Sequence, residues 1–419
     1  MKLYFEDMEI GEIGVPATET PYFNYAESWL ALADAFPLSS TMPLTERRHD
    51  WTVLAPWLIN LLPENSDDIR AMARNLDVPS EDVLALLEKV GRDTSGAISF
   101  AQRGARGADV IPIDGQDDLL RIIEELPAKP FLAGDEGVSM SLAGVQTKLA
   151  VRMLDDGRLG IPINGAASSH ILKPDSPRLA GGVQNEAFCL TLAQLCGIEA
   201  PEVTTGRAGD RTYLLVTRYD RVPDGNQLRR SHQEDFCQAL GYPPSAKYQH
   251  GSGYRGKKVR FREMMERLRA LNPRETEKLW ERMVFNVLCC NTDAHAKNYS
   301  IHIFGDAFEL TPIYDVMCAE AWPKITPYLA FDVDSQRKWR DIEGRHWARE
   351  AVACGFAGRL GPASAEAMAR TILDNLDTAV EHVRQMPAGD HAMLEEFRDA
   401  VERCCLHTLS VIKRYDGKF

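Results

Sequence analysis

The sequence predicts an α+β fold with two lobes and a smaller mixed part in front of them. Short strand patterns separated by turns fill residues 1–27, and strand-like segments dominate residues 148–220. After about residue 230 the apolar residues recur with helical spacing. A strand-rich lobe followed by a helix-rich lobe favours a ligand site in the cleft between them.

The composition is that of a globular chain. Of its 419 residues, 44% are hydrophobic and 26% are charged, and no stretch approaches the length of a membrane span. The formal net charge of −13 argues against a large nucleic-acid-binding surface. The nine cysteines include no CxxC pair, which favours reduced thiols over disulfides or zinc. Since no secretory signal is visible either, we expect a cytoplasmic protein.

Helical patterns occupy residues 51–62, 66–76 and 80–91 of the N-terminal part, and Ser80 and Asp82 are candidate N-terminal caps of the last one. The Gly-rich stretch 103–117 predicts a linker and a domain boundary. The expected division is an N-terminal mixed α/β subdomain at 1–105, an N-lobe at 106–217 and a helical C-lobe at 218–419.

Within the two lobes, strands are expected at 148–154, 169–174 and 212–220, and a helix is expected from Asn185 to about Cys196. Near the C-terminus one helical face carries four apolar or thiol side chains, namely Leu394, Phe397, Val401 and Cys404. This face predicts a long helix packed on the core.

The segment NTDAHAKNYS, residues 291–300, places Asp293 and Asn298 five positions apart. This is the spacing of the protein-kinase catalytic loop, in which the Asp accepts the proton of the substrate hydroxyl and the Asn holds Mg²⁺. Together with the two lobes, it indicates a bilobal protein-kinase-like fold. Asp and Asn are also common in ordinary loops, so the spacing alone is weak evidence.

A β-hairpin is expected directly after Asn298. The sequence YSIHIF-GD-AFELTPIYD alternates apolar residues on both sides of a Gly-Asp turn. Such a hairpin would return Asp315 to the neighbourhood of Asn298 and make it the second Mg²⁺ ligand. The structural alternative is that Asp315 caps a helix that follows it.

Phosphate contacts are expected in the strand-rich lobe. Lys173 ends an apolar run, like the strand lysine of kinases, and Glu186 is its candidate partner. The alternatives are a solvent-facing Lys173 and a Glu186 that complements the dipole of a helix N-terminus. The small and amide residues around Ala143, Gly144 and Gln146 precede a strand and could bind phosphates through backbone N–H groups.

Several stretches occur in an order typical of one family. They are LINLLPEN, EKVGRDTSGAISF, SLAGVQTK, HILKP, NEAFCLTLAQLCGI, RYDR, HQEDFCQALG, NTDAHAKN and LTPIYD. The chain resembles the HipA family of bacterial serine/threonine kinases, the toxins of HipBA toxin–antitoxin pairs. The resemblance covers nearly the whole sequence.

The resemblance implies a role for each matching position. Asp293 would be catalytic, and Asn298 and Asp315 would bind Mg²⁺. Residues expected to bind ATP are Ala143, Gly144, Val145, Gln146, Thr147, Lys148, Lys173, Thr217, Arg218, Tyr219, Asp220, His295 and Lys297, with Asp220 at the ribose and Lys297 at the phosphate. Ser141 would be autophosphorylated, and Ser139 is a second candidate. The segment 232–236 is assigned to structure.

The resemblance also implies the biology. The substrate would be a serine of an aminoacyl-tRNA ligase, most commonly the glutamate enzyme, and its phosphorylation would stall translation and promote dormancy or persistence. The partner would be a HipB-like helix-turn-helix antitoxin that supplies most of the contact with operator DNA, and the pair would repress its own operon. The alternatives are another ligase such as the tryptophan enzyme, a small-molecule phosphotransferase, and a non-catalytic scaffold.

Residues 335–349 interleave basic and aromatic side chains. This pattern could contact DNA or tRNA. The structural alternative is a solvated surface with Trp339 and Trp347 packed inward.

Overall fold

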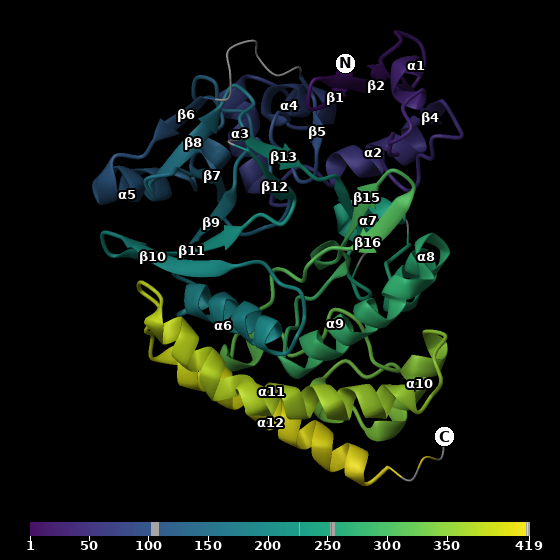
Figure 1. The fold of residues 1–419 in the computed structure, drawn as a ribbon, viewed down its shortest axis with the longest axis vertical. Helices are drawn as coiled ribbons and strands as arrows, with labels where there is room; N and C mark the ends of the chain where they lie inside the picture. Colours follow the sequence, from purple (N-terminus) through teal and green to yellow (C-terminus); the bar gives the residue numbers. More distant parts are fainter. Residues whose placement is uncertain (102–108, 226, 252, 254–255, 416, 418–419) are drawn as a thin grey trace.

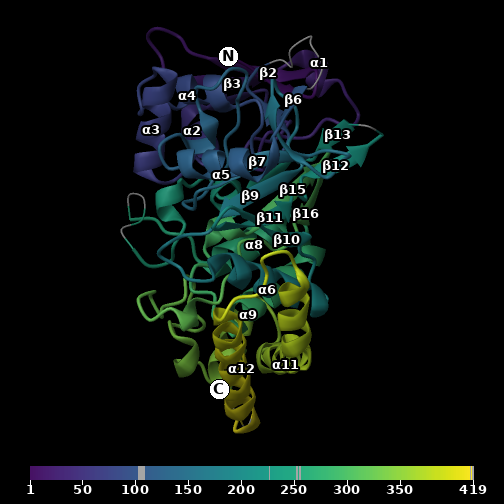
Figure 2. The same ribbon diagram turned by 90° about the vertical axis from the view of Figure 1, so that its left-hand side faces the viewer.

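The structure is a computed structural model, and it describes residues 1–101, 109–225, 227–251, 253, 256–415 and 417. Figure 1 shows the N-terminal part at the top, the strand-rich part below it and two long C-terminal helices at the bottom. Figure 2 shows the same order from the side. The predicted α+β plan of a mixed part, a strand-rich lobe and a helical lobe is therefore confirmed.

The N-terminal part is a five-stranded antiparallel sheet in the order β4-β3-β2-β1-β5, accompanied by helices. Its elements are β1 Lys2–Phe5, β2 Met8–Gly14, β3 Tyr22–Tyr25, α1 Glu27–Leu30, β4 Arg48–Asp50, α2 Trp51–Ile59, α3 Ser66–Leu76, α4 Val83–Val90 and β5 Ile98–Ser99. The predicted helix 66–76 is confirmed. The cap of α4 is Asp82, whose side chain accepts a hydrogen bond from Ala85 N at 3.0 Å. The helix predicted from residue 80 therefore begins at Val83.

The strand-rich part is a six-stranded sheet in the order β10-β11-β9-β7-β8-β6. Its elements are β6 Asp109–Pro112, α5 Gly115–Glu125, η1 Pro130–Leu132, β7 Leu149–Met153, β8 Leu159–Ile163, β9 His170–Pro174, α6 Gly182–Leu195, β10 Val203–Ala208 and β11 Arg211–Thr217. The linker expected at 103–117 lies outside the described residues up to 108, and its remainder is β6 and the start of α5. That remainder is not a linker, because β6 pairs with β8 and joins the sheet.

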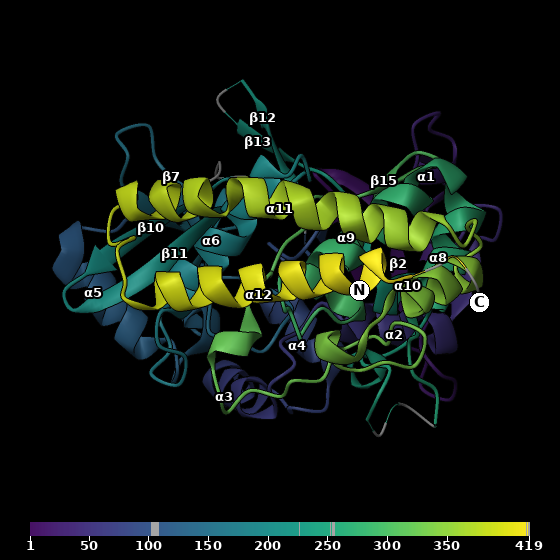
Figure 3. The same ribbon diagram turned by 90° about the horizontal axis from the view of Figure 1, so that it is seen from below.

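The helical part begins with a two-stranded sheet and also contains a three-stranded sheet in the order β14-β15-β16. Its elements are β12 Arg221–Asp224, β13 Gln227–Arg230, β14 Gln233–Asp235, α7 Phe236–Ala239, η2 Pro244–Ala246, α8 Phe261–Leu271, η3 Pro273–Glu275, α9 Thr276–Leu288, η4 Ala296–Asn298, β15 Ser300–Phe304, β16 Ala307–Leu310, η5 Ala319–Ala321, η6 Trp339–Asp341, α10 Gly344–Ala353, α11 Leu360–Gln385 and α12 Met393–Lys413. Seen from below, α11 and α12 run side by side across the whole molecule (Figure 3). Leu394, Phe397, Val401 and Cys404 of α12 are fully buried, as their spacing predicted.

Two hydrophobic cores meet at the central sheet. The first combines the N-terminal part with one face of the sheet, and the second is formed by the helical part and α6. In β11, Leu215 points into the first core while Leu214 and Val216 point into the second, because successive side chains of a strand face opposite sides. The N-terminal part is thus packed into the strand-rich lobe.

None of the nine cysteines forms a disulfide, and eight of them are buried. No helix of the described residues is long and apolar enough to cross a membrane. Trp339 and Trp347 are both buried, as the structural alternative for residues 335–349 expected.

A buried ion cluster ties the N-terminal part to the segment after β11. Asp93 lies 2.8 Å from Arg221 and 3.3 Å from Arg230, and Arg218 donates to Asp220 at 2.9 and 2.7 Å. Burial alone would raise the pKa of Asp93, but the three guanidinium groups outweigh it and hold that pKa well below its usual value. The charged form of Asp93 is therefore part of the fold.

Replacing Asp93 by Asn is expected to lower the free energy of unfolding at pH 7 by about 3–5 kcal/mol, because it removes one of the two buried carboxylates that balance three buried guanidinium groups. Since the folded-state pKa of Asp93 is lowered, wild type holds this contribution above about pH 4 and loses it as the pH falls further. Urea unfolding at pH 7, 4 and 3 should show the difference between the two proteins shrinking toward acid.

The matched control is Asp377→Asn, whose carboxylate is 86% exposed and pairs with Arg398 at the surface. We expect it to cost less than about 1 kcal/mol. Equal losses in Asp93→Asn and Asp377→Asn would contradict the structural role of the cluster.

Candidate active site

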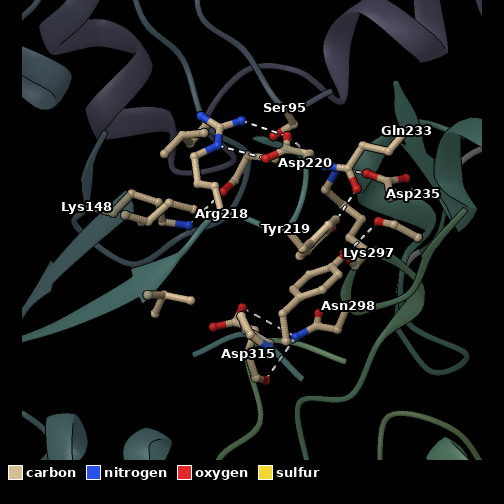
Figure 4. Close-up of a pocket in the computed structure, with 18 of the residues that line it drawn as sticks. Ser95, Lys148, Arg218, Tyr219, Asp220, Gln233, Asp235, Lys297, Asn298 and Asp315 are labelled. Atoms are coloured by element: carbon tan, nitrogen blue, oxygen red, sulfur yellow. Dashed lines mark hydrogen bonds and ion pairs between the residues drawn. The ribbon is translucent and has the colours of Figure 1, made fainter. Parts of the chain in front are cut away.

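A cavity lies between the sheet and the helical part, and most of the residues assigned to ATP line it. They are Ala143, Gly144, Lys148, Lys173, Thr217, Arg218, Tyr219, Asp220, His295 and Lys297, together with Asn298 and Asp315. Val145, Gln146 and Thr147 are not among its lining residues, and Val145 is 57% exposed. Figure 4 shows Asn298 and Asp315 at one end of this cavity and Arg218 and Asp220 at the other.

The hairpin predicted after Asn298 is present and returns the chain to its starting point. Strands β15 and β16 pair from Ile301 with Leu310 to Phe304 with Ala307. The Asn298 amide lies 3.4 Å from the Asp315 carboxylate and 3.3 Å from its carbonyl oxygen (Figure 4). The alternative that Asp315 caps a helix is wrong, because the next helical turn, η5, is preceded by Cys318.

Asp315 has an unusual backbone conformation for a residue with a side chain. Its φ is +58°, in the left-handed region that non-glycine residues seldom adopt. Such strain persists only where the surrounding structure enforces it, and it occurs often at functional sites. Here it turns the carboxylate toward Asn298 and Lys173.

Lys173 at the end of β9 links the sheet to this acidic end of the cavity. Its ammonium group lies 2.6 Å from Glu186 on α6 and 2.8 Å from Asp315. Burial opposes the charge of Lys173, but the two carboxylates outweigh it and raise its pKa, while Lys173 and Lys148 hold the pKa of Asp315 well below its usual value. The solvent-facing alternative for Lys173 is therefore wrong. Helix α6 begins at Gly182, so Glu186 lies in its second turn rather than opening it.

The loop before β7 closes over the cavity. Lys148 Nζ donates to the carbonyl of Ala143 at 2.7 Å. The φ of Gly144 is +108°, a backbone conformation that residues with a side chain rarely adopt, so this turn favours glycine. Burial lowers the pKa of Lys148 to about 8. Lys148 therefore loses its charge at a much lower pH than an ordinary lysine.

The N-terminal part holds this loop in place. Ser141 Oγ donates to the Leu61 carbonyl at 2.9 Å, and Ser141 N donates to the Asp93 carbonyl at 3.0 Å. Glu64 N donates to the Gly144 carbonyl at 3.2 Å. Ser141 is fully buried, whereas Ser139 is half-buried and donates to the Lys89 carbonyl at 2.6 Å.

Asp293 faces a neighbouring groove rather than the cavity itself. Its carboxylate accepts a hydrogen bond from the Tyr248 hydroxyl, and its side chain is exposed toward the groove. Partial desolvation raises the pKa of the carboxyl, and the charge of Asp315 acts in the same direction. Burial keeps the pKa of His295 well below its usual value, and this ring packs edge-on against Tyr248 at 5.0 Å.

Three of the side chains assigned to ATP are instead engaged by other protein groups. The Lys297 ammonium lies between the Asp235 carboxylate and Asn60, whose Oδ1 accepts at 2.8 Å. Asp220 accepts hydrogen bonds from Arg218 and from Gly96 N at 2.8 Å. These contacts give Lys297, Arg218 and Asp220 a structural role. The phosphate contact of Lys297, the adenine-edge contact of Arg218 and the ribose contact of Asp220 stay predictions.

Several lining residues escaped the sequence reasoning, among them Asn60, Glu64 and Tyr314, and so did Tyr248 at the groove. Glu64 pairs with Lys247 at 2.6 Å, and Tyr219 donates to Gln233 at 2.5 Å. Asn60 and Glu64 come from the N-terminal part, more than two hundred residues before the catalytic loop. Only the stretch LINLLPEN, which carries the resemblance, pointed to them.

Comparison with known proteins identifies the family. The family model described as the HipA-like C-terminal domain matches residues 140–383, and the model described as the HipA N-terminal domain matches residues 1–101. The chain belongs to the HipA family. The resemblance inferred from the motifs is confirmed.

Relatives match over most of their length. The serine/threonine-protein kinase toxin HipA of Shewanella oneidensis is 31% identical over 350 residues, covering 80% of this chain and 79% of that protein. A Sinorhizobium fredii protein whose name marks it as a candidate kinase, Y4mE, is 33% identical over 381 residues, covering 86% and 89%. HipA in a solved S. oneidensis complex of HipA, HipB and operator DNA superimposes with a TM-score of 0.86 at 26% identity, covering 99% of this chain and 98% of that one.

Proposed function

We propose that this protein is a serine/threonine protein kinase toxin that transfers the γ-phosphoryl group of Mg-ATP to a serine hydroxyl. The observation that carries the proposal is the convergence of Lys173, Asn298 and Asp315 at one end of a cavity, with Asp293 in the adjoining groove. The names of the relatives from S. oneidensis and S. fredii support kinase activity.

The side chains at the acidic end of the cavity fit a magnesium ion. Asn298 Oδ1 is buried and has no hydrogen-bond partner among the described residues, and a carboxylate lies beside the same amide. No group of three or more His, Cys, Asp or Glu side chains in the described part of the chain could hold a metal alone. That suits Mg²⁺, which is held by one or two protein oxygens plus phosphate oxygens. Asn298 and Asp315 would hold it, and it would offset phosphate charge.

The proposed reaction is an in-line displacement. The serine oxygen forms a bond to the γ-phosphorus while the bond from that phosphorus to the bridging oxygen breaks, and ADP leaves. Asp293 accepts the serine proton, and Lys173 and Lys148 offset the negative charge of the phosphates. Most of the rate gain would come from positioning and electrostatics, because there is little covalent chemistry for the protein to perform.

The position of Ser141 supports autophosphorylation as an inactivating step. Its hydroxyl is fully buried against Leu61, in the segment that leads into the loop over the cavity. A phosphate there would add about −1.5 to −2 charges and could not remain in this contact. The loop would then leave the cavity. Mass spectrometry with and without phosphatase treatment would distinguish Ser141 from Ser139.

The partners are proposed from the family. The solved S. oneidensis complex contains HipB and operator DNA, which supports a HipB-like helix-turn-helix antitoxin here. With a net charge of −13, this chain would contact the operator mainly through that antitoxin, and the pair would repress its own operon. The proposed substrate is an aminoacyl-tRNA ligase in the cytoplasm, namely the glutamate enzyme, with the tryptophan enzyme as the alternative. Its phosphorylation would inhibit translation and promote dormancy.

Replacing Asp293 by Asn is expected to reduce phosphate transfer to protein by about 10²–10⁴-fold, because the serine loses its proton acceptor. Labelled ATP in a lysate of the host should mark a protein band of tRNA-ligase size with wild type and not with the variant. A labelled small molecule without a labelled protein would instead favour a small-molecule phosphotransferase. The matched control is Asp306→Asn in the exposed turn of the same hairpin, which should retain activity. Equal labelling by both variants would contradict the assignment.

The lowered pKa of Lys148 predicts a pH dependence of ATP binding. In the free protein this lysine loses its charge as the pH rises through about 8, and bound phosphates favour the charged form. The dissociation constant for ATP should therefore increase above pH 8, by at most about tenfold per pH unit. Titration calorimetry from pH 7 to 9.5 would measure it. In the Lys148→Arg variant the side chain keeps its charge over this whole pH range. If the affinity of this variant for ATP fell with pH as steeply as that of wild type, the role of Lys148 would be contradicted.

A further inference from the structure

The groove that contains Asp293 is largely apolar. Its walls come from the segment after Asp315 and include Met317, Trp322, Ile325, Tyr328 and Leu329. Ile325 is 36% exposed and Tyr328 is 41% exposed, although both are large hydrophobic side chains. The guanidinium carbon of Arg337 lies 4.5 Å from the Tyr328 ring centroid and supports that ring from one side. The groove is thus a shaped apolar surface that ends at a carboxylate.

The location of the groove defines what can enter it. Lys173, Asn298 and Asp315 line the cavity, whereas Asp293 lines the groove, and Met317 of the groove follows Asp315 by two residues. If the nucleotide occupies the cavity, an acceptor hydroxyl must reach Asp293 from the groove side. Tyr248 of the groove packs against His295 of the cavity, with ring centroids 5.0 Å apart, so the groove adjoins the proposed reaction centre.

A hydroxyl already meets Asp293 from this side. The Tyr248 hydroxyl donates to Asp293 Oδ1, which is the hydrogen bond that an acceptor serine must make. Tyr248 is only half-buried and also lines the groove. The contact shows that the carboxylate is oriented to accept a proton donor from the groove.

We propose that the groove is the acceptor subsite and selects protein segments in which an apolar side chain directly neighbours the serine. This inference rests on the proposed kinase function. The apolar neighbour would pack on Ile325 and Tyr328, and the serine hydroxyl would replace that of Tyr248 on Asp293. The chain's own candidate acceptor has this pattern, since Ser141 lies between Met140 and Leu142.

The test uses two peptides as phosphate acceptors. The first copies residues 136–146 with Ser139→Ala, so that Ser141 is its sole hydroxyl acceptor. The second also carries Met140→Gln and Leu142→Asn, which keep the approximate size of the side chains and remove their apolar character. With wild type we expect kcat/KM to be at least about tenfold higher for the first peptide, the factor for losing the burial of one aliphatic side chain.

Protein variants assign this preference to the groove. Ile325→Asn should reduce the ratio between the two peptides to about twofold or less, mainly by raising KM for the first one. Val352→Asn is the matched control, because Val352 is also a large exposed apolar residue, 54% exposed, and lies on α10 outside the groove. The control should keep the wild-type ratio. A ratio near one in wild type, or an unchanged ratio in Ile325→Asn, would overturn the proposal.

Tyr248→Phe tests the replacement of one hydroxyl by another. Without the tyrosine hydroxyl the serine no longer competes for Asp293, so KM for the first peptide should fall by about twofold or more. A loss of kcat at unchanged KM would show that Tyr248 only positions Asp293, and would overturn its displacement.

The results distinguish a wrong kinase function from a wrong assignment of the acceptor subsite. If wild type labels no protein in the lysate and neither peptide, the proposed function itself is wrong. If wild type labels a lysate protein in an Asp293-dependent way but neither peptide, or both peptides equally, the kinase stands and the acceptor subsite is wrong.

Discussion

The contact between the Lys173 ammonium and the Asp315 carboxylate, at 2.8 Å, is the interaction on which the site depends. It joins the last residues of a strand in one lobe to a loop of the other lobe. Lys173 is buried, and the side chain of Asp315 stays 38% exposed, open to the cavity. A buried lysine needs such partners to remain charged, and Glu186 supplies the second one. The hairpin β15–β16, the left-handed turn at Asp315 and the start of α6 all serve to bring these groups together.

The N-terminal part is a structural component of this site. It shares one core with the sheet, and it contacts the segment that forms the loop over the cavity at Leu61, Glu64 and Asp93. Asn60 also accepts from Lys297 of the catalytic loop. The loop over the cavity and the loop that contains Lys297 are therefore both held by residues of the N-terminal part, which a kinase of two lobes alone would lack.

The sequence was informative where the relevant contacts are local. Periodicity predicted α3 and the buried face of α12, and the length of the hairpin predicted that Asp315 returns to Asn298. It was less informative where a side chain has several possible partners. The resemblance implied a phosphate contact for Lys297, and the structure adds contacts with Asp235 and Asn60 that the sequence did not indicate. Tyr248 and Glu64 carry no local signal, since only tertiary structure brings them to the site.

These contacts explain how one serine could control the whole cavity. Ser141 donates its hydroxyl to Leu61 and its backbone N–H to Asp93, so the same residue is fixed from two separate segments of the N-terminal part. Three residues later Gly144 allows the close approach of Lys148, whose ammonium donates to the Ala143 carbonyl and has a lowered pKa. A charged group on Ser141 would break the first contact, and the loop that positions Lys148 would lose its anchor. The position and the charge of Lys148 at the cavity are therefore both set by the short segment from Ser141 to Lys148.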